Sequence, residues 1–194
     1  MGVGKKAGVV YLIDFGLSKQ FRDPNTHVHI PYIKMCGLTG SAVFTSIHSH
    51  IGWELGRRDD LESLAYILIY FLRGSLPWQN LGHQGNEILK LKQHTDVHDL
   101  CHGLPVEFCK FLQYTRSLSF DDKPDYNYLN DLLDGRLSAL SKEEFPGDSL
   151  FDWSGGPGGQ SVGDRGSVCD AYSTSGIHCT PVLGNSTNYI YVGY

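Results

Sequence analysis

The chain has 194 residues, and its 16 basic and 21 acidic side chains give a formal net charge of −5. This length suits one domain plus a tail, and the acidic balance argues against nucleic-acid binding, which needs a basic face for the phosphates. Hydrophobic residues make up 41 % of the chain, enough for a core, and no run reaches the ~18 apolar residues of a membrane helix.

The cysteines favour a reducing compartment. There are five of them, with no CxxC pair, which argues against both a disulfide framework and a ribbon-type zinc site. The N-terminus, MGVGKKAG, lacks the apolar segment of a secretory signal. We therefore expect a cytoplasmic or nuclear protein without a membrane segment.

The first predicted element is a short buried strand from Val9 to Ile13, which is continuously apolar. Asp14-Phe15-Gly16 ends this strand, and the stretch from Leu17 to Trp53 follows without a clear period. Because that stretch is rich in Gly, Thr, Ser, His and Pro, we expect an ordered functional loop.

A central helix is predicted to begin at Asp59 and Asp60, because carboxylates there accept the N–H groups that a first turn leaves unpaired. Its apolar residues recur at helical spacing: Leu61, Leu64, Ala65, Leu68 and Leu72. Further apolar residues occupy the other sides, so we expect this helix to be buried on nearly every face. Gly74 and Pro77 end it.

Three more helices are predicted, over residues 87–92, 106–115 and 125–140. The fold class is therefore mainly α, with four or five helices and at most one pair of strands. Residues 154–194 differ in composition, since 17 of these 41 residues are Gly, Ser or Pro. They predict a flexible tail after a domain of residues 1–153, with a possible strand over residues 188–194.

The sharpest functional signal is the motif Asp14-Phe15-Gly16 directly after an apolar strand. The motif alone occurs by chance, but a long loop, Gly40-Ser41 and the helix opened by Asp60 follow it in order. This order resembles the C-terminal lobe of a protein kinase. In that setting the Asp chelates the Mg²⁺ that bridges the ATP phosphates, because Mg²⁺ prefers oxygen ligands.

Longer strings narrow the resemblance. They are IDFGLSKQFRDPNTHVHIPY, LTGSAVFTSIHSHIG, RRDDLESLAYILIYFLRGSLPWQ, FDDKPDYNYL and SLFDW. Together they resemble the casein kinase 1 family over residues 1–153. The resemblance implies a kinase C-lobe fold and transfer of the ATP γ-phosphoryl group to Ser or Thr of a protein substrate. ATP and Mg²⁺ are the implied cofactors.

The resemblance also implies roles for four residues by position. Asp14 would be the Mg²⁺ ligand, and Ile13 would touch the adenine. Ser41 matches the activation-loop hydroxyl that reaches toward the catalytic base. Asp60 matches a buried structural carboxylate that accepts N–H bonds from the catalytic loop. His48 stands where this family usually has Asn.

Several kinase parts are not found in the sequence: the Gly-rich loop, the strand Lys, the helix Glu, and the catalytic-loop Asp and Asn. Met1-Gly2 aligns just after the catalytic loop, and Gly2-Val-Gly4 does not replace the Gly-rich loop. The basic surface for acidic substrates is also reduced, with Cys36, Val43 and Phe44 at family positions. We therefore expect this chain alone to be catalytically inactive, with no catalytic base.

Two alternatives stay open. The chain could be a non-catalytic interaction module, because the cleft floor around Ile13, Phe15 and Leu17 would expose apolar surface to a protein partner or to a second copy. It could also be an unstable fragment of an incomplete gene model, since Asp60 would lack its N–H donors.

His94, His98 and His102 are spaced by four residues and invite a metal interpretation. The intervening Thr95 and Gly103 make a continuous helix poor, so we favour surface histidines. His48 and His50 are interpreted as packing groups. The run Arg57-Arg58-Asp59-Asp60 is interpreted as a solvated salt-bridge cluster, with an anion site as the alternative.

Overall fold

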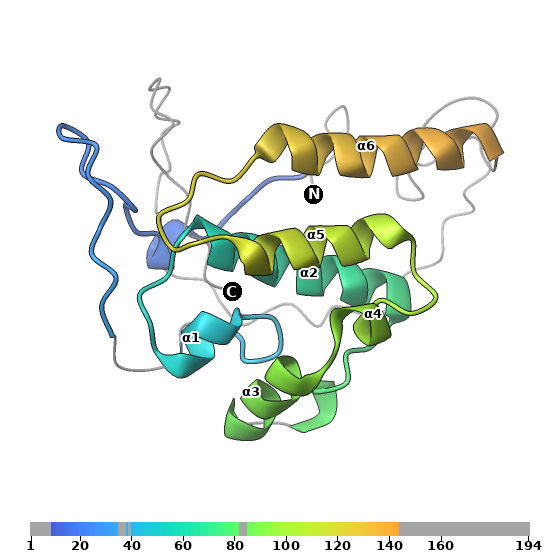
Figure 1. Ribbon diagram of the computed structural model, residues 1–194, viewed down its shortest axis with the longest axis horizontal. Helices are drawn as coiled ribbons and strands as arrows, with labels where there is room; N and C mark the ends of the chain where they lie inside the picture. Colours follow the sequence, from blue (N-terminus) through green and yellow to red (C-terminus); the bar gives the residue numbers. More distant parts are fainter. Residues whose placement is uncertain (1–8, 35–37, 39, 82–84, 144–194) are drawn as a thin grey trace, which may run out of the picture. The chain divides into compact units, whose positions relative to one another are not determined.

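The computed structural model describes residues 9–34, 38, 40–81 and 85–143, the last with side chains to residue 136 (Figure 1). Residues 13–143 of this part belong to one compact unit, and Val9–Leu12 belong to another. The predicted boundary at Trp153, the tail over 154–194, its possible strand, Gly2, Gly4 and Cys36 all lie outside the described residues.

The described part is mainly helical, as predicted. Its α-helices are α1 (Ile47–Ile51), α2 (Arg57–Arg73), α3 (Gly85–His94), α4 (Val97–Leu100), α5 (Val106–Ser117) and α6 (Tyr126–Glu143). Two 3₁₀ turns, η2 (Phe15–Leu17) and η3 (Gln79–Leu81), accompany them. Within the described residues, β pairing is limited to two isolated bridges, Arg22 with His29 and Lys34 with Trp53. No described helix is both long and apolar enough to cross a membrane.

The core lies between α2 and α5, which pack side by side and run in opposite directions (Figure 1). Tyr66 and Ile69 of α2 and Leu112 of α5 are completely buried, and α6 covers α5 with Leu129. Trp78 is also completely buried, edge-on to Tyr66 at 5.3 Å between ring centroids. Burial of such large side chains contributes about 1.5–3 kcal/mol each, so these helices hold the unit together.

The ends of α2 follow from local chemistry. The backbone N–H of Gly56 donates to Oδ2 of Asp59 at 2.8 Å, which pairs a group that the first turn would leave exposed. At the other end Gly74 takes a left-handed conformation, with φ of 76°, and its N–H donates to the carbonyl of Tyr70. Glycine adopts this conformation without steric cost, so the predicted end at Gly74 is confirmed.

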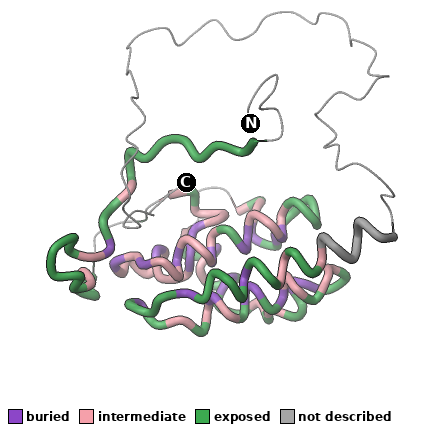
Figure 2. The backbone as a smooth tube through the Cα atoms, turned by 90° about the horizontal axis from the view of Figure 1, so that it is seen from above, coloured by how far each residue is buried: buried purple, intermediate pink, exposed green. Residues whose placement is uncertain are grey.

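The other predicted helices are confirmed as α3, α5 and α6, each slightly longer than its pattern. The two short helices α1 and α4 were not predicted. The expectation that α2 is buried on nearly every face is wrong. Leu64, Phe71 and Leu72 are exposed by 41, 73 and 48 % respectively, because the helices that pack on α2, α5 and α1, leave part of its surface uncovered. Figure 2 shows buried and exposed stretches alternating along the helices.

The predicted buried strand is also wrong. Residues 9–13 have no strand assignment, and each side chain is exposed, from 44 % at Val9 to 73 % at Val10 and Ile13. A strand needs a neighbouring strand for its N–H and C=O groups. The described residues contain no extended ladder that could pair with this segment.

The long loop after Leu17 is ordered by aromatic contacts rather than by a ladder. The rings of His29 and Tyr32 lie 4.6 and 4.7 Å from Phe120, and Tyr32 stacks on Trp53 at 4.6 Å. Such pairs contribute about 0.5–1.5 kcal/mol beyond their buried area. They fasten residues 29–32 to the connection between α5 and α6.

Candidate functional site

Asp14 sits in an uncommon backbone conformation. Its φ of 63° and ψ of 70° are left-handed, and its Oδ1 accepts a hydrogen bond from the N–H of Gly16 at 3.3 Å. Phe15–Leu17 then form η2, closed by the Ser18 N–H donating to the Phe15 carbonyl at 3.0 Å. A left-handed non-glycine residue costs free energy, and such residues cluster at functional sites. The turn leaves the Asp14 carboxylate exposed.

The other site residues predicted from sequence lie on different elements. Ile13 is 73 % exposed. Ser41 is exposed and begins a turn in which its carbonyl accepts from the N–H groups of Phe44 and Thr45, both at 3.0 Å. Asp60 lies half-buried in the first turn of α2, whereas the capping contacts of that turn belong to Asp59. In the described part, Asp14 and Ser41 share no hydrogen bond or ion pair.

Asp14 fits Mg²⁺ as a single ligand. It offers one exposed carboxylate, the donor type that Mg²⁺ prefers. Among the described residues, however, no group of three metal-ligating side chains includes Asp14. A Mg²⁺ ion held by one or two carboxylates takes its remaining ligands from water and from phosphate oxygens. At Asp14 the described residues therefore offer one exposed carboxylate, and no set of three ligands around it.

The junction of α1 and α2 holds a buried carboxylate with several partners. Asp59 is 3 % exposed, and its Oδ1 accepts from the Ser46 hydroxyl at 2.7 Å while Oδ2 accepts from the Gly56 N–H at 2.8 Å. Ser46 is itself the N-cap of α1 and accepts the N–H of Ser49 at 3.1 Å. The first turns of both helices are therefore tied together through Asp59.

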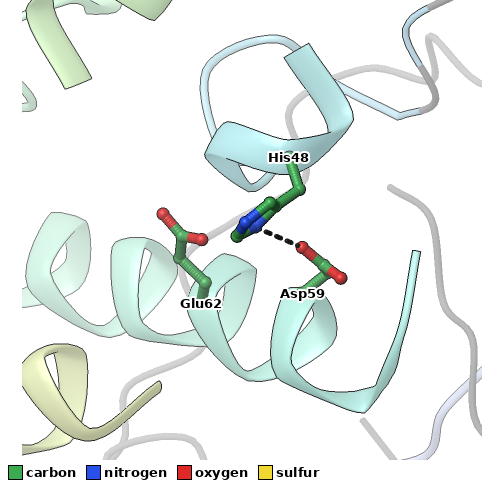
Figure 3. A group of neighbouring side chains, drawn as sticks. All are labelled: His48, Asp59 and Glu62. Carbon is green, nitrogen blue, oxygen red and sulfur yellow. Dashed lines mark ion pairs between the residues drawn. The ribbon is translucent and has the colours of Figure 1, made fainter. Parts of the chain in front are cut away.

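His48 completes a compact cluster with two carboxylates (Figure 3). Its Nδ1 lies 3.3 Å from Oδ1 of Asp59, and Glu62 lies one turn further along the same face of α2. One ligand atom from each residue lies within 4.8 Å of the other two. Nδ1 of His48 is shielded from solvent and has no hydrogen-bond partner. The sequence interpretation of His48 as a packing group missed this cluster.

Glu62 is also held in place by polar neighbours. Its Oε1 accepts from the Tyr66 hydroxyl at 2.6 Å and lies 3.5 Å from Nε of Arg116. Arg116 donates in turn to the Tyr66 oxygen at 2.7 Å. Burial and the nearby charge of Glu62 raise the pKa of Tyr66 well above its usual value, so the hydroxyl stays a donor.

A buried lysine fastens the turn that follows Ser41. Nζ of Lys92 donates to the carbonyls of Ala42 at 2.9 Å and Thr45 at 2.6 Å, and lies 3.2 Å from Nε2 of His50. Burial lowers the pKa of Lys92 to about 7, and burial and the Lys92 charge lower that of His50 to about 4. Nothing in the sequence marked Lys92.

The same turn is held from a second side. Nε1 of Trp78 donates to the carbonyl of Val43 at 2.8 Å. The ring of Phe44 packs edge-on against Tyr70 of α2 at 5.5 Å. The backbone that follows Ser41 is therefore held by Lys92, Trp78 and Tyr70, while Ser41 itself is exposed.

The histidines spaced by four residues do not form a site. His94, His98 and His102 are exposed, α3 ends at His94, and α4 covers only Val97–Leu100. His94 pairs with the Lys90 carbonyl at 2.7 Å, and His98 with Gln113 at 2.9 Å. All three side chains lie on the surface, so the favoured prediction of surface histidines is confirmed.

The run from Arg57 to Asp60 is structural. Arg57 donates to the carbonyl of Asp121 at 2.8 Å, and Arg58 donates to the carbonyl of Leu118 at 3.1 Å. Both guanidinium groups therefore fasten α2 to the connection between α5 and α6. The interpretation of this run as a solvated salt-bridge cluster is therefore only partly right: Arg58 and Asp59 lie 3.6 Å apart, but their side chains are 11 and 3 % exposed, so the pair is largely buried.

No known protein-family model matches this chain. Its function therefore rests on the chemistry of the residues described above. Two places carry that chemistry: the exposed Asp14 carboxylate with the fastened Ser41 turn, and the buried cluster of His48, Asp59 and Glu62.

Proposed function

We propose that residues 1–153 form the helical lobe of a Ser/Thr protein kinase of the casein kinase 1 type. In this proposal the lobe supplies the Mg²⁺-ligating Asp14, the adenine contact Ile13 and the substrate-side turn at Ser41. It catalyses phosphoryl transfer to protein substrates only together with the kinase parts that its sequence does not contain.

The observation that carries the proposal is the geometry of Asp14. A left-handed backbone at a residue other than glycine is uncommon, and such residues cluster at functional sites. Here Asp14 has φ of 63°, caps a 3₁₀ turn through Gly16 and keeps its carboxylate exposed. When bound, Mg²⁺-ATP supplies the γ-phosphoryl group and the charge that this carboxylate balances.

The Ser41 turn supports the same proposal. Phosphoryl transfer depends on positioning, because the reacting groups must be held close together before reaction. Lys92 and Trp78 hold the backbone of this turn through three hydrogen bonds, at 2.9, 2.6 and 2.8 Å. A hydroxyl on such a fixed turn is suited to orienting a catalytic group from another part of the kinase.

The kinase motifs that the sequence lacks decide which activity we expect from this chain alone. A kinase needs a Gly-rich loop over the phosphates, a Lys–Glu pair, and a catalytic-loop Asp and Asn. The 194 residues contain none of these motifs. Without them the positioning and the catalytic base are lost together, so we expect no turnover by this chain alone.

The test is transfer of radiolabelled phosphate from ATP to a casein-type acidic substrate. We expect the full chain to incorporate no more label than its Asp14→Ala variant. Incorporation by the full chain clearly above that variant would show that these residues catalyse the reaction alone, and would overturn the proposed inactivity.

A second candidate function is a non-catalytic interaction module. Ile13, Phe15 and Leu17 are exposed by 73, 60 and 57 %, and clustered exposed apolar side chains mark protein-binding surfaces. Sedimentation of the full chain and of a variant with Ile13→Ser and Phe15→Ser tests this function. A concentration-dependent dimer that the variant abolishes would favour self-association. A monomer in both cases would leave the kinase-lobe function as the better account.

A further inference from the structure

We propose that His48, Asp59 and Glu62 form a binding site for Zn²⁺ at the junction of α1 and α2. This site is separate from the Asp14 carboxylate and does not depend on the proposed kinase function. Its three residues come from two helices that Asp59 already ties together through Ser46 and Gly56.

The donor set suits zinc. Zn²⁺ takes imidazole nitrogen and carboxylate oxygen ligands at about 2.0–2.2 Å, in tetrahedral sites whose ligand atoms are therefore about 3.3 Å apart. Nδ1 of His48 and Oδ1 of Asp59 are 3.3 Å apart. The Glu62 ligand atom lies no more than 4.8 Å from either, so a modest side-chain rotation brings it to bonding distance. Three protein ligands leave one position for water.

The state of His48 points to a ligand. Its Nδ1 is shielded from solvent and makes no hydrogen bond, although it faces the Asp59 carboxylate across 3.3 Å. Imidazole nitrogens are the commonest metal ligands in proteins, and this one has no partner that an ion would have to replace by breaking a hydrogen bond. The side chain as a whole is 28 % exposed, so the cluster is open to an ion from solvent.

Hydrogen-bond donors orient the two carboxylates. In metal sites, the ligands are oriented in the same way by groups that do not touch the metal. Each carboxylate oxygen can accept two partners. Oδ1 of Asp59 takes the Ser46 hydroxyl and Oε1 of Glu62 takes the Tyr66 hydroxyl, at 2.7 and 2.6 Å. Both oxygens keep capacity for an ion, and groups of this kind typically change metal affinity 10- to 100-fold when removed.

Two arginines lie close to the carboxylates that would bind the metal ion. Nε of Arg58 lies 3.6 Å from Oδ2 of Asp59, and Nε of Arg116 lies 3.5 Å from Oε1 of Glu62. These ion pairs balance the carboxylates when no metal is bound. Zn²⁺ therefore competes with these two arginines for the carboxylates. The imidazole is the ligand that decides affinity, which makes His48 the residue to test.

The experiment measures Zn²⁺ binding to the full 194-residue chain, without an added histidine tag, by competition with a chromophoric chelator. The test variant is His48→Asn, whose amide is polar but shorter than the imidazole. The matched control is His102→Asn, because His102 is exposed and outside the cluster. We expect the wild-type chain to bind one equivalent of Zn²⁺. Its affinity for Zn²⁺ should fall at least about tenfold in His48→Asn and stay unchanged in His102→Asn.

Equal Zn²⁺ affinity and stoichiometry in the wild type and His48→Asn would overturn the proposal. If circular dichroism shows that His48→Asn does not fold, His48→Gln takes its place with the same expected loss. A second measurement needs no variant: Zn²⁺ bound to the folded chain raises its unfolding temperature by mass action. A wild-type unfolding temperature that is the same with Zn²⁺ and with chelator would also overturn it.

Discussion

Similar apolar side chains are buried in one region of the unit and exposed in another. In the helical region, Phe111 of α5 is 2 % exposed and Ile69 of α2 is completely buried. In the segment Ile13–Leu17, Phe15 is 60 % exposed and Ile13 is 73 % exposed. The amino-acid types are alike, so the difference lies in what each region packs against. The helices cover one another, whereas no described residue buries the side chains of Ile13 and Phe15.

The largest expected difference between the two regions is in the cost of removing a phenylalanine. Phe111→Ala leaves a cavity in the core and should lower the free energy of unfolding by about 3–5 kcal/mol. Phe15→Ala removes an exposed ring and should change it by less than about 0.5 kcal/mol. Urea unfolding of both variants makes the measurement. Comparable losses would show that the motif segment is packed as tightly as the helices.

The second prediction concerns the buried polar junction. Asp59→Ala removes the acceptor for the Gly56 N–H and the Ser46 hydroxyl and leaves both without their partner. We expect a loss of about 3 kcal/mol in the free energy of unfolding. The control, Asp134→Ala, changes an exposed carboxylate of α6 and should stay within about 0.5 kcal/mol. Equal effects in the two variants would contradict the junction described above.

The third prediction compares two glycines. A Cβ added at Gly56 would lie 2.7 Å from the Phe120 carbonyl oxygen, so Gly56→Ala should destabilise the protein by about 1–3 kcal/mol. A Cβ at Gly135 in α6 would meet nothing within 4 Å, so Gly135→Ala should stabilise it by about 0.5–1 kcal/mol. Thermal unfolding distinguishes the two. A neutral Gly56→Ala would mean that α2 and the α5–α6 connection lie further apart.

The fourth prediction concerns the pH dependence of stability. The pKa of Lys92 falls from 10.5 to about 7 on folding, so between these values the unfolded chain binds a proton that the folded chain does not. Stability contributed by this group therefore rises with pH across this window. Lys92→Met should remove that rise. Unfolding temperatures measured through the window give the slope, and identical slopes in wild type and variant would show that Lys92 is charged when folded.

The sequence predicted the helices that carry their own periodic pattern. The spacing from Leu61 to Leu72 and the stop at Gly74 were sufficient for α2, because these signals are local. The short helix α1 was missed because its N-cap, Ser46, is oriented by Asp59, which is 13 residues away. Burial of Lys92 was equally invisible, since it depends on carbonyls 47 and 50 residues away.

The candidate sites also contain parts that the sequence predicts and parts that depend on packing. The motif at Asp14 was visible in the sequence, and the structure adds its left-handed backbone. The pair Asp59 and Glu62 shared a helix face by spacing alone, but His48 comes from another helix. Its approach to 3.3 Å from Asp59 required the packing of α1 against α2. Sequence reasoning also placed Val9–Ile13 in a strand, because an apolar run does not show whether a partner strand exists.

The most direct test of the central claim is complementation of activity. The full chain is mixed with a separate fragment of a casein kinase 1 enzyme that carries the Gly-rich loop, the strand Lys, the helix Glu and the catalytic loop. Phosphate transfer from ATP to a casein-type substrate is then measured. Our account predicts transfer by the mixture that neither part shows alone and that Asp14→Asn abolishes. Formation of a complex that transfers no phosphate, or transfer that Asp14→Asn leaves unchanged, would contradict it.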